Sequence, residues 1–279
     1  MIASFWIQLM TNPFLQTAIL IAFAASIAGG IVGSYVVSKR IVFISGSVSH
    51  AVLGGIGFFV YMQYLTGLTF FSPLLGGILS ALLFAFLIGW IHLKFHERED
   101  TVIAAIWSIG MALGVIFIAI VPGTNAQLMD FLFGNLLWAS RSELWALLIL
   151  DGVIALVAMI FHKRFLAICF DETQSYLQGQ PVKFLYFLLL TLVAVTVVML
   201  IQIIGAILVI ATLCLPAAIA NLLTNRLSKM IYIAIFLSCL FSFIGVYLSY
   251  LFNWPPGSTI ALTITLFYFL SLPLKSRSV

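Results

Sequence analysis

The chain has 279 residues, of which 64% are hydrophobic and only 7% are charged, and its formal net charge is +4. Soluble globular domains carry about 25% charged residues, so this composition excludes that class. Several uncharged stretches have the length of a helix that crosses a bilayer, about 20 residues. We therefore expect an all-α polytopic membrane protein, whose basic residues set its orientation in the membrane and do not bind nucleic acid.

The first residues, MIASFWIQLMTNPF, lack the basic stretch that opens a secretory signal, so we expect an amphipathic interfacial segment of the mature chain. An uncharged run then covers residues 184–223, twice the length of one span, and must fold back near Gln202–Gly205. The pattern predicts nine spans, with eight as the alternative. They are 14–36, 48–66, 73–93, 103–121, 143–161, 184–203, 205–223, 231–252 and 256–272.

The basic residues predict the orientation of these spans. With nine alternating spans, eleven of the twelve lysines and arginines fall on one side, and only Arg141 falls on the other. Positively charged loops stay in the cytoplasm, so we expect the N-terminus outside and the C-terminus inside.

The segment 122–142 is too polar to span, but its LMDFLFGNLLW stretch would form a short half-helix that dips into the outer mouth. Asp130 and Glu143 flank this mouth, where they would attract cations or contact a binding protein. The alternative is that both are solvated loop charges.

The longest cytoplasmic segment contains FDETQSYLQGQPV. Asp171 suits an N-cap, Glu172 favours the first turn of a helix, and Gly179 suits a left-handed residue after its end. The pattern predicts a short helix over 171–178, either a surface connector or a docking helix for a cytoplasmic motor. No segment is long enough for an enzyme module and no GxxxxGK[ST] loop is present, so a partner must supply any ATP hydrolysis.

Six segments follow one another over almost the whole length: NPFLQTAILIAFAASIAGGIVGSYVVSKRIVFISGSVSHAVLGGIG, REDTVIAAIWSIGMALGV, FLFGNLLWASRSEL, FDETQSYLQGQPV, IGAILVIATLCLPAAIANLL and PPGSTIAL. Together they resemble the permease subunits of the metal-type (ABC-3) importers, which carry manganese, zinc or iron(II) into bacteria. The resemblance implies one transmembrane permease domain, 1–279, of the ABC type II importer kind, with its ATPase-coupling helix at 171–178.

The resemblance also implies the partners and the cargo. A second permease copy (or close paralogue), two cytoplasmic P-loop ATPases and an extracytoplasmic metal-binding protein would assemble in the bacterial inner membrane. The divalent ion is the transported cargo, and no permanently bound cofactor is expected.

His50 is the leading candidate for the ion path, because imidazole is a common metal ligand and ionisable groups inside the membrane usually face a pathway. The alternative is a packing histidine hydrogen-bonded between helices. Ser47 or Ser49 would complete the ligand shell. Many family members carry an aspartate four residues before this histidine, whereas this chain has Gly46, so the expected carboxylate ligand is missing.

The remaining candidates have weaker grounds. Asp151 is the carboxylate that lies clearly inside a span, and either a pathway role or a packing role fits it. His92 and His96 share a helical face and could bind zinc, but a solvated helix end is the favoured interpretation. Cys214 and Asn221 could line a path, although packing is the safer interpretation for both.

These features predict the membrane subunit of an ATP-driven importer of Mn²⁺, Zn²⁺ or Fe²⁺, acting by alternating access. Two alternatives remain open. A permease for a metal chelate, such as a siderophore or cobalamin, would need a wider path. A gradient-driven transporter would need charged networks at mid-membrane, where this chain offers only His50 and Asp151.

Overall fold

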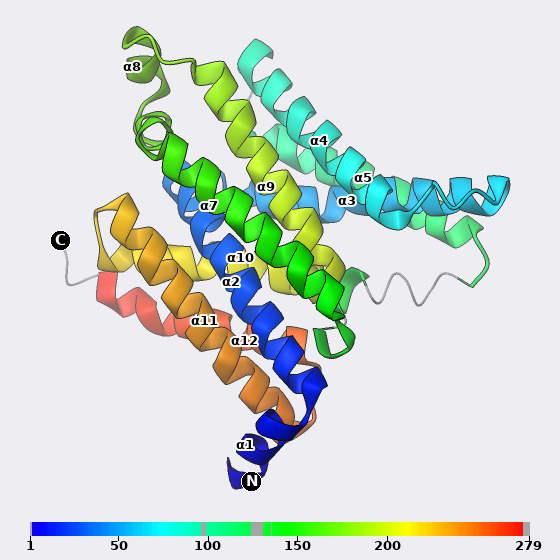
Figure 1. The fold of residues 1–279 in the computed structure, drawn as a ribbon. Helices are drawn as coiled ribbons and strands as arrows, with labels where there is room; N and C mark the ends of the chain where they lie inside the picture. The colour runs from blue at the N-terminus through cyan, green and yellow to red at the C-terminus, as the bar shows by residue number, and fades with distance from the viewer. Residues whose placement is uncertain (1, 96–98, 124–130, 135, 276–279) are drawn as a thin grey trace.

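In the computed structural model, the described residues are 2–95, 99–123, 131–134 and 136–275, and they contain helices and turns but no strand (Figure 1). In chain order the elements are α1 (Ile2–Thr11), α2 (Pro13–Lys39), α3 (Val42–Thr66), α4 (Pro73–Phe95), α5 (Glu99–Ile120), the 3₁₀ turn η1 (Leu136–Trp138), α7 (Arg141–Phe170), α8 (Glu172–Leu177), α9 (Val182–Ile204), α10 (Ala206–Leu223), α11 (Leu227–Phe252) and α12 (Pro256–Lys275).

Within this described part, nine helices are long and apolar enough to cross a bilayer, which confirms the predicted number and order of spans. Several of the predicted spans were too short. The second span begins at Val42 instead of residue 48, and the fifth continues to Phe170 instead of ending at 161. Hydropathy marks only the part of a helix in hydrocarbon, whereas the backbone hydrogen bonds continue the helix into the polar interface.

Helix α2 is the central helix of the fold. In its most apolar 18-residue window 83% of the residues are buried, against 22% for α7, so α2 is enclosed by protein while α7 lies at the periphery. Helices α7, α10 and α11 pack around α2. Helices α3, α4 and α5 form a second group, which α9 joins to the first (Figure 1).

The two long helices of the uncharged run meet at Gly205, which has a φ of +79°. A residue with a side chain would be strained in this conformation, so glycine permits the sharp reversal between α9 and α10. The reversal confirms the predicted fold-back. Phe133, in the described part of the predicted half-helix, packs against this reversal. A Cβ on Gly205 would lie 2.5 Å from the carbonyl carbon of Phe133.

The predicted helix between the fifth and sixth spans is present as α8. The Asp171 side chain accepts a hydrogen bond from the Gln174 amide at 2.9 Å, as an N-cap does. At the other end, Gly179 has a φ of +75°, and the Gly179 and Gln180 amides donate to the Tyr176 and Ser175 carbonyls. This pair of bonds is a Schellman ending, which confirms the predicted caps.

The amphipathic N-terminal segment is the helix α1. Its Phe5 side chain is 1% exposed and packs edge-on against Phe243, Tyr247 and Tyr250 of α11. These contacts fasten α1 to α11 at the end of the molecule opposite α8 (Figure 1).

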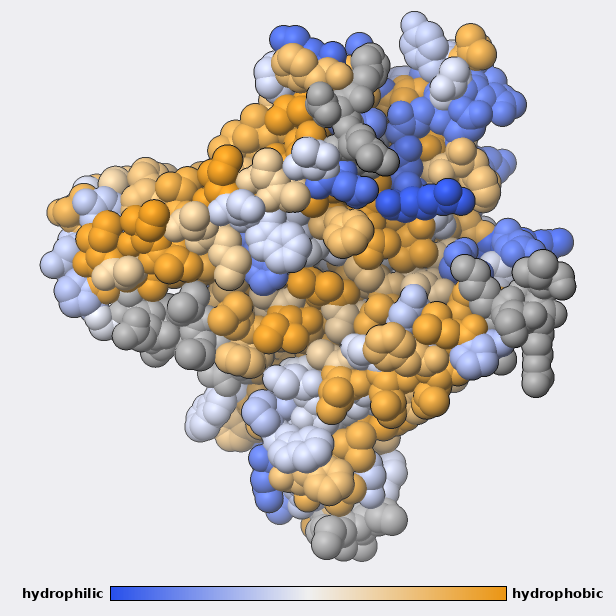
Figure 2. Space-filling view, turned by 180° about the vertical axis from the view of Figure 1, so that it is seen from behind, coloured by the Kyte–Doolittle hydropathy of each residue, from blue (hydrophilic) through white to orange (hydrophobic). Residues whose placement is uncertain are grey.

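The surface separates into an apolar middle and polar ends. Figure 2 shows hydrophobic residues over most of the broad middle of one side, with hydrophilic residues gathered toward the end that carries α8. We call this end the α8 end; α2, α4, α7, α10 and α12 finish there, and α3, α5, α9 and α11 begin there.

Candidate functional site

His50 lies two turns into α3, where its ring stacks on Trp107 of α5. The two ring centroids are 4.8 Å apart and the rings are nearly parallel, at 4°. One turn earlier, the Ser47 hydroxyl donates a hydrogen bond to the Ile103 carbonyl of α5 at 2.9 Å. The side chain of His50 is therefore oriented by α5 and not by a flexible loop.

Glycines allow α3 and α5 to approach this closely. A Cβ on Gly54 would lie 2.7 Å from the carbonyl oxygen of Gly110, and a Cβ on Gly57 would lie 2.8 Å from that of Gly114. Small residues spaced at one helical turn permit such backbone contact in membranes. A neighbouring helix therefore approaches the His50 face of α3 closely, and this neighbour is α5 of the same chain.

The imidazole of His50 has one nitrogen without a partner. Its Nδ1 atom is buried, and no group in the described part of the chain forms a hydrogen bond with it. A neutral imidazole nitrogen in this state has the chemistry of a metal ligand. The side chain itself is only half-buried within one chain.

Ser47 and Ser49 are fully buried, and neither hydroxyl is hydrogen-bonded to His50 among the described contacts. The Ser49 hydroxyl donates to the Ser45 carbonyl of its own helix at 2.7 Å. Because each hydroxyl donates its proton to a backbone carbonyl, only oxygen lone pairs remain for a cation. Their role as ligands stays a prediction.

Gly46 leaves space on the turn before His50. A Cβ at this position would meet one atom within 4 Å, the Cδ1 of Ile210 on α10, at 3.9 Å. Beside it, the Ser45 hydroxyl and the Cys214 thiol of α10 are 3.1 Å apart, so Cys214 serves as a contact between helices. His50 and Gly46 therefore lie where α3 meets α5 and α10.

Asp151 is in a different part of the molecule. Its side chain is 6% exposed, and α7, which carries it, packs on α2 and α9 and not on the α3–α5 pair. No described group forms a hydrogen bond of normal geometry with either carboxylate oxygen, and the backbone of Ala28 on α2 is one polar group near them. The structure does not bring Asp151 together with His50.

The two candidates for the outer mouth have different outcomes. Asp130 lies outside the described residues. Glu143 forms a capping box at the start of α7, where its Oε2 accepts from the Ser140 amide at 2.6 Å and the Ser140 hydroxyl accepts from the Glu143 amide at 3.3 Å. A role of Glu143 in attracting cations stays a prediction.

At the α8 end, Glu172 forms an ion pair with Lys39 at the last residue of α2. This pair connects α8 to the central helix, a contact for which the sequence carried no local signal. The apolar side chains of Phe170, Tyr176 and Leu177 are 76%, 71% and 79% exposed. The last residue of α7 and the end of α8 therefore present exposed aromatic and aliphatic side chains, while Glu172 anchors α8 to α2.

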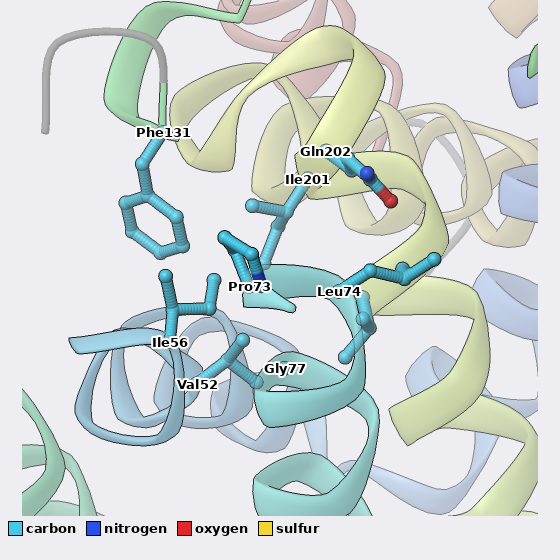
Figure 3. Close-up of a pocket in the computed structure, with 9 residues that line it drawn as sticks. Val52, Ile56, Pro73, Leu74, Gly77, Phe131, Ile201 and Gln202 are labelled. Carbon is cyan, nitrogen blue, oxygen red and sulfur yellow. The ribbon is translucent and has the colours of Figure 1, made fainter. Parts of the chain in front are cut away.

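A cavity of about 220 Å³ lies between α3, α4 and α9, beside Phe131 (Figure 3). Val52 and Ile56 line it from α3, on a different face of that helix from His50. Its lining is apolar apart from Gln202, which lies across the cavity from Phe131 in Figure 3. This lining offers no ligand set for a divalent ion.

In the described part of the chain, no three His, Cys, Asp or Glu side chains gather as a metal-binding group. His96, which the sequence placed on one helical face with His92, lies outside the described residues. A ligand role of His50 therefore stays a prediction.

The match to known proteins extends from end to end. Residues 11–275 match the ABC 3 transport family. The chain belongs to this family. It is an ABC permease of the metal transport type, a membrane component of transport and not an enzyme.

Similar proteins carry metal transport names. A "Probable metal transport system membrane protein" of Chlamydia trachomatis is 49% identical over 94% of this chain and 89% of that protein. The "Manganese transport system membrane protein MntC" of Listeria monocytogenes is 34% identical over 94% of this chain and 91% of its own length.

A similar fold is known from a solved structure, PsaBC from Streptococcus pneumoniae in complex with Fab. Its matching chain is 32% identical, with a TM-score of 0.84 over 99% of this chain and 98% of that one. The expected fold class, an all-α ABC permease, is confirmed. The sequence did not predict that Trp107 stacks on His50. The available signal was the single tryptophan in the REDTVIAAIWSIG segment.

Proposed function

We propose that this chain is the membrane-spanning subunit of an ATP-driven importer that moves Mn²⁺, Zn²⁺ or Fe²⁺ into the cytoplasm by alternating access. The observation that carries the proposal is the end-to-end relationship to membrane proteins named for metal and manganese transport. The ion is cargo and not a resident cofactor.

The surroundings of His50 support an ion path at the junction of α3, α5 and α10. The stack on Trp107 fixes the ring, and the unpartnered Nδ1 atom supplies a ligand atom. Because the side chain is only half-buried in one chain, a second copy could bring a second His50 to the same path. Two imidazoles with water would hold a borderline-soft ion without trapping it.

The geometry of α8 supports its proposed role as the coupling helix over 171–178. Its exposed Tyr176 and Leu177 would insert into a cytoplasmic ATPase subunit, two of which would serve the pair of permeases. The Glu172–Lys39 ion pair would then transmit movement of α8 to α2, the most enclosed helix. Asp171 and Gly179 keep the short helix intact by capping its two ends.

Orientation follows from the charges at the helix ends. Lysines and arginines accumulate at the α8 end, so we propose that this end faces the cytoplasm and that the N-terminus lies outside. An extracytoplasmic binding protein would deliver the ion to the opposite end, where Glu143 lies. The setting would be the bacterial inner membrane.

The test is uptake of radioactive Mn²⁺ or Zn²⁺ into proteoliposomes that contain the permease and its ATPase, with the binding protein added outside. We expect uptake to require hydrolysable ATP. Uptake that is the same with and without ATP would overturn the importer assignment in favour of a gradient-driven transporter.

Two variants separate ligation from packing at His50. His50→Ala removes both the nitrogens and the stack on Trp107, whereas His50→Phe preserves a ring for stacking and removes only the nitrogens. If the imidazole ligates the ion, both variants lose apparent metal affinity by at least about 10–100-fold, the loss typical of removing a group that only orients a metal ligand. Wild-type uptake in His50→Phe would return His50 to a packing role.

A further inference from the structure

A groove lies beside the central helix α2, away from His50 and from the cavity between α3, α4 and α9. Helices α7 and α11 form its walls and α2 its floor, an arrangement visible at the front of Figure 1. Its volume is about 370 Å³. Most of the lining is aliphatic, contributed by Ile31, Ala155, Ala158, Met159, Ile231 and Ile235.

The groove has one polar end, built from three helices. The Tyr35 hydroxyl of α2 is 2.8 Å from Nδ1 of His162 on α7, and the Nε2 atom of His162 is 2.8 Å from the Ser228 hydroxyl of α11. If Tyr35 donates to Nδ1, the Nε2–H donates to Ser228, and the proton of the Ser228 hydroxyl is then free to donate outward. Because Ser228 is exposed, this donor is available to a group outside the protein.

Three basic residues adjoin this polar end along the chain. Lys163 follows His162, Lys229 follows Ser228, and Arg226 immediately precedes α11, and all three basic side chains are exposed. The acidic group known at this end of α2, Glu172, is already paired with Lys39. Among the described residues no ion pair involves Lys163, Arg226 or Lys229, so a phosphate would meet both a hydroxyl donor and unpaired cations.

The depth of the polar end suits a lipid headgroup. His162 is eight residues before the end of α7, about 12 Å along the helix axis, and Ser228 is in the first turn of α11. Both positions lie just outside the predicted apolar spans 143–161 and 231–252, where these helices would leave the hydrocarbon. The aliphatic part of the groove extends from there toward the middle of the bilayer, in the direction of an acyl chain.

We propose that this groove binds an anionic phospholipid of the leaflet at the α8 end. One acyl chain lies along the Ala155–Ala158 face of α7, and the phosphate lies at Ser228 among Lys163, Arg226 and Lys229. Basic pockets between transmembrane helices bind anionic headgroups by this combination of charge and hydrogen bonding. The site is independent of the ion path, since α7 and α11 carry none of the groups around His50.

The first experiment compares lipids. The purified, delipidated permease is titrated with phosphatidylglycerol or phosphatidylcholine of the same acyl chains, and bound lipid is counted by native mass spectrometry. We expect phosphatidylglycerol to bind more tightly and its preference to weaken with salt. Equal affinity for the two lipids would overturn the assignment of the headgroup site.

Variants then locate the lipid. Each basic residue near a membrane surface contributes about fivefold to anionic lipid binding, so Lys163→Gln with Lys229→Gln should weaken phosphatidylglycerol binding about 25-fold. The charge-matched control is Lys94→Gln with Lys183→Gln, which removes two cations from other helices at the same end. Equal losses in the two double variants would show a diffuse surface effect and refute the groove.

A third variant tests the aliphatic part of the groove. Ala155→Leu narrows the groove and should reduce retained lipid while the basic residues remain. If Ala155→Leu lowers the yield of folded protein, the double variant Lys163→Gln with Lys229→Gln still tests the site. A change from dimer to monomer in Ala155→Leu without loss of lipid would identify a second copy as the occupant and overturn the proposal.

Discussion

Replacing Gly46 with aspartate is the most direct probe of the region around His50. The two positions are four residues apart on α3, so their side chains lie on adjacent turns of one face. A Cβ at position 46 meets only the Cδ1 of Ile210, at 3.9 Å, so the backbone does not need to move. The substitution therefore adds a carboxylate beside the imidazole without a steric penalty at the first carbon.

The expected magnitude has two opposing parts. Without metal, the new carboxylate is buried and unpaired, which costs the folded state several kcal/mol. With metal, a charged ligand contributes about 1.5–3 kcal/mol, equivalent to roughly 10–100-fold tighter binding. Gly46→Asp should therefore lower the Tm in a chelator and recover stability as Mn²⁺ or Zn²⁺ is added, by about 2.7 kcal/mol at a metal concentration of 100 Kd.

The assay is thermal unfolding of the purified permease in detergent over a metal titration, with calorimetry to measure the Kd. Gly46→Ala is the steric control and should be near neutral, within about 1 kcal/mol, because alanine favours helix and the site has room. Gly46→Asn preserves the shape and removes the charge. If Gly46→Asp and Gly46→Ala respond identically to metal, position 46 does not face the ion and the missing-ligand reasoning is refuted.

Two further predictions concern packing and coupling. Gly110→Ala should destabilise the protein by about 1–3 kcal/mol, because its Cβ would lie 2.8 Å from the carbonyl oxygen of Ala51. The control Gly152→Ala should be neutral or stabilising, because a Cβ there has nothing within 4 Å. Equal Tm values for the two variants would contradict the close approach of α3 and α5. Glu172→Gln should reduce the transport per ATP hydrolysed in the reconstituted complex. Adding Lys39→Gln to this variant should cause little further loss, because the two residues form one ion pair. Additive losses in this double-mutant cycle would count against the ion pair as the coupling contact.

The number of spans, their order and the caps of α8 could be predicted because each depends on local chemistry. An uncharged run of 20 residues must be helical in lipid, where every backbone polar group needs a partner. Asp171 and Gly179 act on the amides and carbonyls within a few residues of them. The helix ends were less accurate, because hydropathy does not show how far a helix continues beyond hydrocarbon.

The sequence by itself thus determined a nine-span helical permease, with His50 as the candidate in its path and Gly46 in place of a carboxylate. Only the tertiary structure decided what each polar group faces: His50 stacks on Trp107, Asp151 lies apart on α7, and Glu172 pairs with Lys39. The physical reason is that helix formation and membrane insertion depend on neighbours a few residues away. The contacts of a polar side chain depend instead on which helices pack together, and in this fold glycine contacts between α3 and α5 set that packing across more than 50 residues of chain.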